Sequence, residues 1–443
     1  MSKYQAYPEY KDSGNRLLGE IPKHWQLTRI KYVAEITPKK PRVDRQQMCS
    51  FIPMEKLKTN SIVLDEIRQI GDVYDGYTYF ANNDILMAKV TPCFENKNIA
   101  IAKGLINQIG FGSSEIYPIR VNEKTNNRFL FYRLQEDGFM ELAIGTMTGA
   151  GGLRRVPSET LTNYIYALPA YEEQEKIASF LDHETAKIDT LIDKQQQLIQ
   201  LLKEKRQAVI SHAVTKGLNP NAPMRDSGVE WLGEVPEHWE MTRAKFVSNI
   251  FIPQRNKPEL NDAEGTAWVT MENMKTSYIE NTSLYVSRNA SKVAGSKKLK
   301  KDSVIASCVG NFGVAAINKV DVIINQQLQA FIPFAIKAEY LRELVAMSTV
   351  YFELVGTAAT LTYVNQEGFE NLPVLVPPAN EQKKICIYLE AENMKFENLI
   401  DKAQSAIQLM QERRTALISA AVTGKIDVSH WQVPAPMQSK EAV

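Results

Sequence analysis

Two long stretches of the chain lack glycine and proline and carry apolar residues at alternating spacings of three and four. They cover residues 172–213 and 381–421. A helix rises by about 1.5 Å per residue, so each stretch predicts a rod of roughly 60 Å. A helix of this length with a period near 3.5 is typical of a coiled coil.

Both stretches place their apolar residues in the same register. Polar residues interrupt each series, so neither helix should be stable alone. We therefore expect the two helices to pack against each other in antiparallel orientation, each returning to a domain at its own end. Two independent surface helices are the alternative. The predicted contact residues are Leu181, Ile188, Leu191, Leu198, Leu202, Leu389, Phe396, Leu399, Met410 and Leu417.

The segments that precede the helical stretches have the mixed pattern of α/β domains. Short β-rich runs occur at residues 85–88 and 304–309, bounded by turn-forming residues. Each segment also contains a helix-like run, at residues 129–142 and 338–354, which a Gly-Thr pair follows. We therefore expect the two segments to share one fold.

The chain also repeats short motifs. Those that recur 214 residues later are Asp12-Ser13-Gly14, Leu18-Gly19-Glu20, His24-Trp25 and Thr28-Arg29. Those that recur 208 residues later are Glu173-Gln174, Leu191-Ile192-Asp193-Lys194 and Ala213-Val214-Thr215. Residues 30–165 and 244–370, which lie between the motifs, differ almost everywhere. The pattern indicates a repeated framework that carries two unlike inserts.

These patterns predict an α+β chain with an internal pseudo-two-fold repeat. Two similar α/β domains, an arrangement that suits the binding of two different targets, are separated by two long helices that pack as an antiparallel coiled coil. The predicted boundaries are residues 1–168 for the first domain, 169–216 for the first helix, 217–372 for the second domain, 373–427 for the second helix and 428–443 for a flexible tail.

Composition narrows the class of protein. A chain of 443 residues with 44% hydrophobic content can bury two cores of ordinary size. A net charge of +1 gives no global attraction to polyanions, so local patches must hold any nucleic acid. The four cysteines are scattered without metal-ligand spacing, and no apolar run is long enough to span a membrane. We expect a reduced, metal-free protein in the cytoplasm, without a membrane partner.

Motifs for catalysis or cofactor binding are incomplete. The spacing from Gly71 to Gly76 suits a phosphate loop, but Tyr77 stands where the lysine is required. The glycine-rich run at residues 149–152 lacks the strand-to-helix context of a dinucleotide site. His24 and His238 have no matching nucleophile, so we expect structural roles for them and anchoring roles for the tryptophans that follow. The chain is therefore expected to have neither catalytic residues nor a cofactor of its own.

Local clusters of basic and amide side chains are the candidate DNA-binding residues. Such runs are often an ordinary solvated surface, but two unlike inserts on a rigid spacer suit a protein that contacts two half-sites along a duplex. The candidates are Lys89, Thr91, Asn96, Lys97, Lys103, Arg154 and Arg155 in the first insert, and Arg288, Lys292, Lys297, Lys298, Lys300, Lys301 and Asn311 in the second.

One further polar run is interpreted differently. Asn325-Gln326-Gln327 aligns with Ser113-Ser114-Glu115, and both runs precede a predicted strand. A framework role is favoured for them.

The order and duplication of the motifs resemble the specificity subunit of type I restriction-modification systems. The shared features are Leu-Gly-Glu-x-Pro-x-His-Trp at residues 18–25 and 232–239, Pro-x-x-x-Glu-Gln at 169–174 with a shorter counterpart at 378–382, and the Ala-Val-Thr endings at 213 and 421.

The resemblance implies a DNA-binding scaffold without catalytic activity. Its partners would be double-stranded DNA, two methyltransferase subunits that carry S-adenosylmethionine, and restriction subunits that use ATP and Mg. The DNA site would be bipartite and asymmetric. Two alternatives stay open: a stand-alone bipartite DNA-binding regulator without an enzymatic partner, and a coiled-coil adaptor whose inserts bind proteins. An associated methyltransferase would argue against the first, and salt-sensitive DNA binding would argue against the second.

Overall fold

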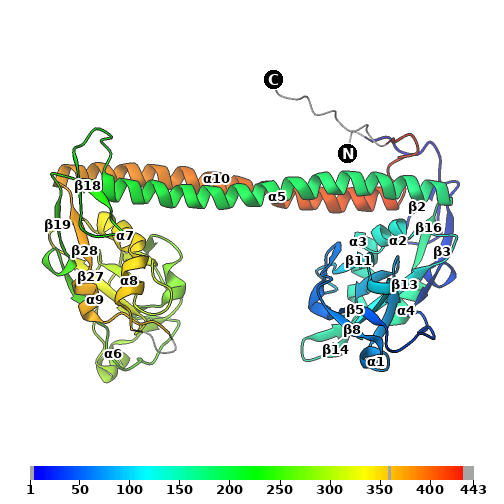
Figure 1. Cartoon of the computed structure of the whole chain (residues 1–443), viewed down its shortest axis with the longest axis horizontal. Helices are drawn as coiled ribbons and strands as arrows, with labels where there is room; N and C mark the ends of the chain where they lie inside the picture. The colour runs from blue at the N-terminus through cyan, green and yellow to red at the C-terminus, as the bar shows by residue number, and fades with distance from the viewer. Residues whose placement is uncertain (1–3, 358–360, 433–443) are drawn as a thin grey trace. The chain divides into compact units, whose positions relative to one another are not determined.

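Two units make up the chain, and each combines an α/β body with parts of two long helices. Unit 1 comprises Met1–Gln196 and Ser405–Val443, and unit 2 comprises Gln197–Gln404. The structure is a computed structural model that describes residues 4–357 and 361–432. Figure 1 shows the elements of each unit.

Two four-stranded sheets form the body of unit 1. The first has the order β11 (Ile99–Ile101), β10 (Ile85–Ala88), β13 (Ile116–Val121) and β4 (Ala34–Ile36), with antiparallel neighbours throughout. The second has the order β8 (Ile67–Gln69), β5 (Met48–Ile52), β12 (Ile109–Gly112) and β9 (Thr78–Ala81), and here β5 and β12 are parallel. α1 (Ile70–Val73) follows β8, and α4 (Ser158–Asn163) precedes β16.

Unit 2 repeats this plan with different strand lengths. Its larger sheet has the order β20 (Ser248–Phe251), β27 (Leu328–Pro333), β24 (Val304–Ser307), β25 (Ala315–Asn318) and β22 (Tyr278–Ile279). Its smaller sheet has the order β23 (Tyr285–Val286), β21 (Thr266–Val269) and β26 (Val322–Ile324), with β21 and β26 parallel. The expectation that the inserts share one fold is confirmed.

Each insert begins and ends on a pair of strands in the same register. In unit 1, β3 (Gln26–Arg29) pairs with β16 (Ile165–Leu168), so that Arg29 lies opposite Ile165. In unit 2, β19 (Glu240–Arg243) pairs with β28 (Pro373–Val376), so that Arg243 lies opposite Pro373. The hairpins β1–β2 (Tyr10–Asp12, Glu20–Pro22) and β17–β18 (Met224–Asp226, Glu234–Pro236) precede them.

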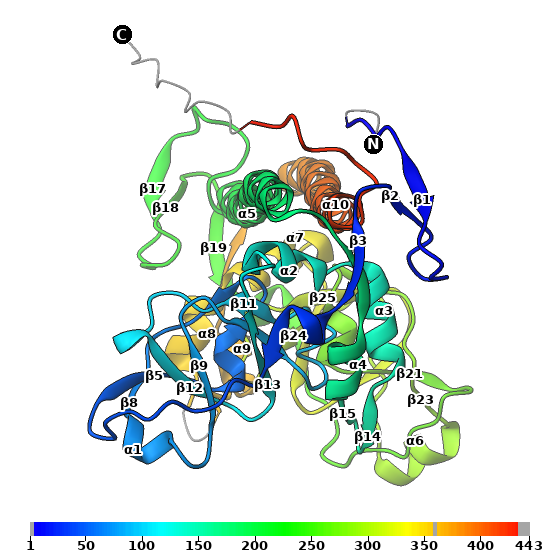
Figure 2. The ribbon, with the colours of Figure 1, turned by 90° about the vertical axis from the view of Figure 1, so that its right-hand side faces the viewer.

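The two long helices are α5 (Tyr171–Lys216) and α10 (Ala379–Val422). They lie side by side in both views (Figures 1 and 2). Arg414 contacts Asp189 at 2.9 Å in unit 1, and Arg206 contacts Glu397 at 3.2 Å in unit 2. Early residues of one helix thus meet late residues of the other, which is the expected antiparallel arrangement. The second helix is shorter than the predicted span 373–427, because that span begins with strand β28.

Seven of the ten predicted contact positions between the helices are buried or partly buried. Leu181, Ile188, Leu389, Phe396 and Leu417 are buried, and Leu202 and Met410 are partly buried. The prediction is wrong for Leu191, Leu198 and Leu399, whose exposed fractions are 50%, 43% and 49%.

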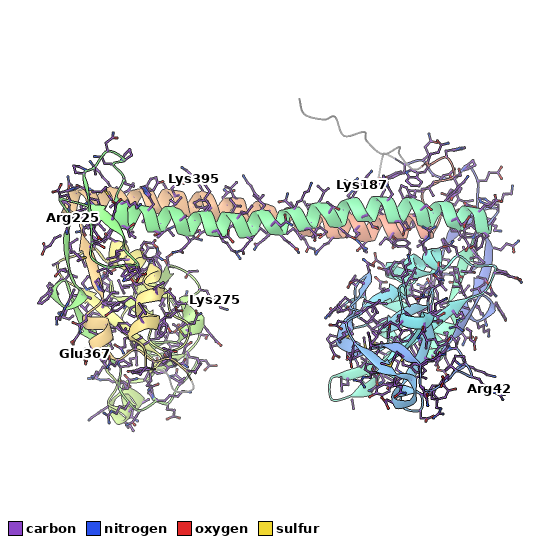
Figure 3. All side chains as sticks on the ribbon, in the orientation of Figure 1. Arg42, Lys187, Arg225, Lys275, Glu367 and Lys395 are labelled. Atoms are coloured by element: carbon purple, nitrogen blue, oxygen red, sulfur yellow. The ribbon has the colours of Figure 1, made fainter. Side chains whose placement is uncertain are left out.

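Between the packed residues that recur at every seventh position, each helix has a second packed residue, and it lies one position later than predicted. Ile192 is buried, and Ile199, Ile400 and Ile407 are partly buried. Spacings of 3-4 and 4-3 satisfy the same heptad, and adjacent apolar pairs such as Leu191-Ile192 let the sequence fit both. On the exposed faces of the helices, Lys187 forms an ion pair with Glu184, and Lys395 forms one with Glu392 (Figure 3).

The two helix-like runs of the inserts are each divided. Residues 129–142 belong to α2 (Asn127–Arg133) and α3 (Asp137–Gly145), and residues 338–354 belong to α7 (Ala338–Met347) and α8 (Thr349–Val355). The Glu136 carboxylate accepts hydrogen bonds from the N–H groups of Gly138 and Phe139, so it caps the start of α3. A single continuous helix is therefore wrong in both inserts.

The structure also differs at the start of the predicted tail. Val428 is buried, and the Trp431 ring lies 5.6 Å from the Phe180 ring in an edge-on arrangement. Val428 and Trp431 thus pack within unit 1. Residues 433–443 of the predicted tail lie outside the described residues. Among the residues that are described, no helix is both long enough and apolar enough to cross a membrane.

Candidate nucleic-acid interface

A buried tryptophan and a glutamate join the opening segment of unit 1 to the long helix. Trp25 is fully buried, and its Nε1 donates a hydrogen bond to Glu173 Oε1 at 3.1 Å. His24 Nε2 lies 2.9 Å from Glu173 Oε2, and the Tyr7 hydroxyl donates to Glu173 at 2.7 Å. The repeated His-Trp and Glu-Gln motifs therefore meet in space.

Unit 2 has the same junction. Trp239 Nε1 donates to Glu381 Oε2 at 2.9 Å, and His238 Nε2 lies 2.9 Å from Glu381 Oε1. Burial alone would raise the pKa of Glu381, but the hydrogen bonds from Trp239 and His238 outweigh it and hold the pKa below its ordinary value. The anchoring role expected for the tryptophans is confirmed.

The glutamine of each Glu-Gln motif fixes the insert to the long helix. Gln174 Oε1 accepts a hydrogen bond from the N–H of Asn126 at 2.8 Å, where α2 begins. Gln382 Oε1 accepts one from the N–H of Lys337 at 3.0 Å, where α7 begins. The repeated residues thus form a framework that presents both inserts in the same way.

Loops of different sequence meet at equivalent places on the two inserts. In unit 1, the loop after β10 meets the hairpin β14 (Thr148–Ala150) and β15 (Leu153–Arg155), since Thr91 N donates to Arg154 O at 2.9 Å. In unit 2, Gly310 N donates to Thr362 O at 2.9 Å.

We call these loops, with the adjoining turn before β13 or β27, the recognition face. It comprises residues 89–98, 113–115 and 146–156 in unit 1, and 308–314, 325–327 and 361–363 in unit 2. Within unit 1, hairpin β14–β15 lies at the end away from the long helices (Figure 1).

Two candidate arginines lie together on the recognition face of unit 1. Arg154 Nη2 donates to Glu95 at 2.7 Å, and Arg155 Nε donates to Glu115 Oε2 at 2.9 Å. The Arg155 hydrogen bonds hold the pKa of the Glu115 carboxyl below its ordinary value. Both arginine side chains are nearly half exposed, at 47% and 46%. They can therefore contact a ligand while their carboxylate partners orient them.

The other candidates in unit 1 have varied settings. The Lys89 ammonium lies 5.1 Å from the Tyr117 ring centre, and Asn96 is exposed. Thr91 is buried, where its hydroxyl donates to Gly152 O, and Lys97 Nζ donates to Gln135 O at 2.8 Å. These last two side chains hold the loop in place. Lys103 is exposed but lines a different hollow, beside α2 and α5.

The basic run of unit 2 is partly neutralised. Arg288 and Lys292 lie on α6 (Arg288–Ala294), and the other four lysines follow it. The Asp321 carboxylate lies 3.2 Å from Lys300 Nζ and 3.6 Å from Lys298 Nζ, and it accepts the N–H of Lys301.

Asp302 directly follows this run in the sequence, but Asp321 lies 20 residues beyond Lys301, so sequence analysis could not identify it. Lys297 and Lys301 are exposed. Asn311, the remaining candidate, is exposed on the loop after β24.

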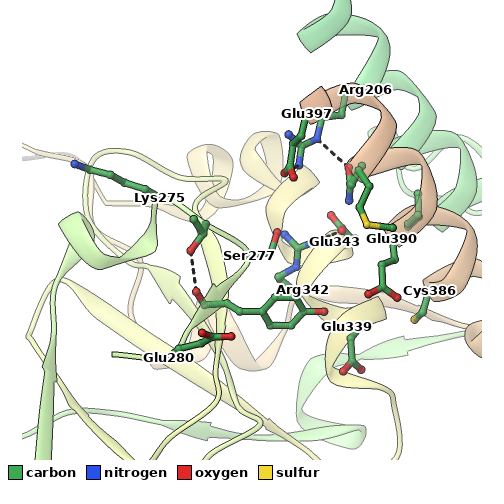
Figure 4. A pocket seen from close by; sticks show the side chains of 15 residues that line it. Arg206, Lys275, Ser277, Glu280, Glu339, Arg342, Glu343, Cys386, Glu390 and Glu397 are labelled. Atoms are coloured by element: carbon green, nitrogen blue, oxygen red, sulfur yellow. Dashed lines mark hydrogen bonds and ion pairs between the residues drawn. The ribbon is translucent and has the colours of Figure 1, made fainter. Parts of the chain in front are cut away.

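A polar crevice of about 470 Å³ lies elsewhere on unit 2, between α7, α10 and the segment before β22 (Figure 4). Arg206 Nε donates to Asn393 at 2.8 Å there, and Arg342 contacts the buried Glu343, whose pKa burial raises. The crevice belongs to the helix framework rather than to the recognition face. Among residues 4–357 and 361–432, no group of histidine, cysteine and acidic side chains is arranged to hold a metal ion.

Two copies of one fold, joined to the same helices by the same contacts but with different polar faces, define a protein with two recognition modules. The chain belongs to the family of the type I restriction modification DNA specificity domain, whose model matches residues 22–201 and 236–403. The resemblance inferred from the duplicated motifs is confirmed.

Individual relatives of the chain are also specificity subunits of type I restriction enzymes. The specificity subunits of the Escherichia coli type I restriction enzymes EcoAI and EcoEI are 37% and 33% identical over 193 residues, which are 41% of this chain. The match spans about a third of each of these relatives, 33% and 32% of their lengths. The Methanocaldococcus jannaschii MjaVIII specificity subunit is 21% identical and matches over 93% of this chain and 95% of its own. Such subunits are non-catalytic components of type I restriction enzymes.

Solved structures show the same fold. A chain from a study titled as the structural basis of complex assembly and conformational transition of the type I R-M system superposes with a TM-score of 0.75, at 16% identity, over 92% of this chain and 99% of its own. The HsdS subunit from Thermoanaerobacter tengcongensis gives a TM-score of 0.55, at 16% identity, over 92% and 98%.

Proposed function

We propose that this chain binds a bipartite, asymmetric DNA site and positions adenine methyltransferase and restriction subunits on it. The observation that supports this function is the pair of unlike recognition faces on one repeated framework. Base edges in DNA differ in their hydrogen-bond donors and acceptors, so faces with different side chains should select different bases.

The chemistry would belong to the partners. S-adenosylmethionine would be bound by two methyltransferase subunits, and ATP and Mg by the restriction subunits. This chain would supply sequence selection, and its lysines and arginines would contact phosphate oxygens. We place the complex in the cytoplasm.

The long helices would set the number of unread bases between the half-sites. α5 runs without a break through residue 216, and its packed positions repeat every seven residues. Inserting seven residues between Gln195 and Gln197 should preserve the packing and lengthen the unread spacer. An unchanged spacer in the methylated sequence would rule out this role for the helix.

The direct test is the methylated motif in a host that expresses this chain with its methyltransferase. We expect N6-methyladenine in a bipartite motif with two different half-sites. The purified chain alone should not transfer methyl groups. Methyl transfer by the chain alone, or methylation at an undivided motif, would contradict the proposal.

A further inference from the structure

A hollow of about 370 Å³ in unit 2 is lined by amide side chains. It lies at the ends of the parallel strands β21 and β26, and Asn325 N donates to Val269 O there at 3.0 Å. Asn273, Asn325 and Gln327 line it, together with Trp268 and the acidic Glu272. Amides can donate and accept hydrogen bonds at once, so this hollow suits a ligand that offers both.

Asn325 holds the amide of Gln327. Asn325 Nδ2 donates to Gln327 Oε1 at 3.4 Å, and Gln327 N donates to Asn325 Oδ1 at 3.2 Å. Gln327 is exposed, and its Nε2 has no hydrogen-bond partner among the residues that the structure describes. The glutamine amide is therefore oriented by its neighbour while its N–H groups are open to a ligand.

The surroundings of the hollow suit a nucleic acid. Gln326 Nε2 donates to the carbonyl oxygens of Gln254 and Arg255 at 3.3 and 3.2 Å, and Lys297 N donates to Gln254 Oε1 at 3.2 Å. The backbone atoms of Arg255 and Lys297 thus lie beside the amides of Gln326 and Gln254, and both side chains are exposed, with the Lys297 ammonium 3.2 Å from the carbonyl oxygen of Ile252. Phosphate contacts of this kind position a protein on DNA while neighbouring polar groups contact the bases.

The equivalent turn in unit 1 has different chemistry. Glu115 O accepts the N–H of Lys89 at 3.0 Å, as Gln327 O accepts the N–H of Cys308 at 2.9 Å. The Glu115 carboxylate is engaged by Arg155, whereas Gln327 is held by another amide. One position in the shared fold thus presents an arginine-carboxylate pair in unit 1 and an amide pair in unit 2.

We propose that Gln327 contacts an adenine in one half-site and that Asn325 is its positioning residue. This inference rests on the proposed function. A glutamine amide matches adenine because it can accept from N6 and donate to N7. The framework role expected for residues 325–327 then applies to Gln326, whose side chain is bound to backbone carbonyls.

The test is to express Gln327→Ala, Asn325→Ala and Gln327→Glu variants of the full chain with the methyltransferase and to map the methylated motif. Gln327→Ala should reduce discrimination at one adenine by roughly 5- to 150-fold and leave the other half-site unchanged. Asn325→Ala should weaken the same position by less. Gln327→Glu should move the preference there toward cytosine, whose N4 donates to a carboxylate.

Two measurements separate base contact from a structural role. DNA affinity of Gln327→Ala should keep the wild-type salt slope, because no charge is removed. The melting temperature should match that of Gln366→Ala, a control at an exposed glutamine on α9 (Gln366–Glu370) of the same unit.

The outcomes distinguish the two proposals. An unchanged motif in Gln327→Ala, or a lowered melting temperature with loss of both half-sites, would overturn this inference while the wild-type motif remained bipartite. Absence of a bipartite motif in the wild type would overturn the proposed function as well.

Discussion

The framework junctions of the two units are nearly identical, whereas their recognition faces differ in kind. Trp25 and Trp239 make the same hydrogen bond to a glutamate of the long helix. At the recognition face, Arg155 pairs with Glu115 in unit 1, while uncharged amides occupy the equivalent turn in unit 2. Buried contacts thus maintain one architecture, and exposed residues on it are free to differ.

The strongest way to break this equivalence is to remove the anchoring tryptophans. Trp25→Ala and Trp239→Ala should each destabilise their own unit by about 3–5 kcal/mol, because each leaves a cavity and a glutamate without its N–H donor. Calorimetry should show a lower unfolding temperature for the affected unit. Phe246→Ala, at a side chain that is 62% exposed, is the control. A large effect from only one tryptophan would show that the junctions are not equivalent.

The contact between the helices can be tested at adjacent residues of unit 1. Ile192→Ala should cost about 2–4 kcal/mol, because the side chain is only 8% exposed. Leu191→Ala, at a side chain that is 50% exposed, should cost less than about 1 kcal/mol. Chemical denaturation of both variants measures the difference. A larger loss from Leu191→Ala than from Ile192→Ala would favour the register that was predicted from the sequence.

The basic run of unit 2 should contain lysines of unequal effect. Lys301→Gln should lower the slope of log affinity against log salt by about 1 if this side chain contacts phosphate. Lys300→Gln should lower it less, because Asp321 already lies 3.2 Å from the Lys300 ammonium. Fluorescence anisotropy over a range of salt concentrations checks both. Unchanged slopes would assign the run to ordinary solvated surface.

The smallest expected effect is a pH dependence of fold stability, and it concerns only the recognition face of unit 1. The pKa of Glu115 is below its ordinary value of 4.5, so its pairing stabilises the fold above that pH and the stabilisation is lost as pH falls through the lowered pKa. The pair is partly exposed, so Glu115→Gln should cost about 0.2–1 kcal/mol at neutral pH and less near pH 3. Thermal melts of both proteins at the two pH values measure this. A stability difference between the wild type and Glu115→Gln that grew as the pH fell would contradict a stabilising pairing of the Glu115 carboxylate.

The framework could be predicted from the sequence because it is repeated. The His-Trp and Glu-Gln motifs recur at fixed offsets, and each is local in the chain. Their meeting at Glu173 requires a contact across 148 residues, which no local pattern encodes. The helix contacts were predicted at seven of ten positions, and the others were placed wrongly because a pair such as Leu191-Ile192 fits two heptad registers equally well.

The recognition face was less predictable for a physical reason. Basic residues in a run suggest a cationic patch, but the charge depends on acids that the fold brings near, as Asp321 shows. Thr91 and Lys97 looked like ligand-binding residues, yet backbone carbonyls engage both. Gln327 was assigned a framework role, because an amide run before a strand gives no signal of ligand binding until the hollow beside it is known.

Each insert is expected to select its own half-site, and an exchange of inserts can show whether it does. Residues 244–372 can be replaced by residues 30–164, because Arg29 and Arg243 occupy equivalent strand positions opposite Ile165 and Pro373. Co-expressed with the exchanged chain, the methyltransferase should methylate a motif in which both half-sites carry the sequence specified by the first insert. Persistence of the original second half-site would contradict the account.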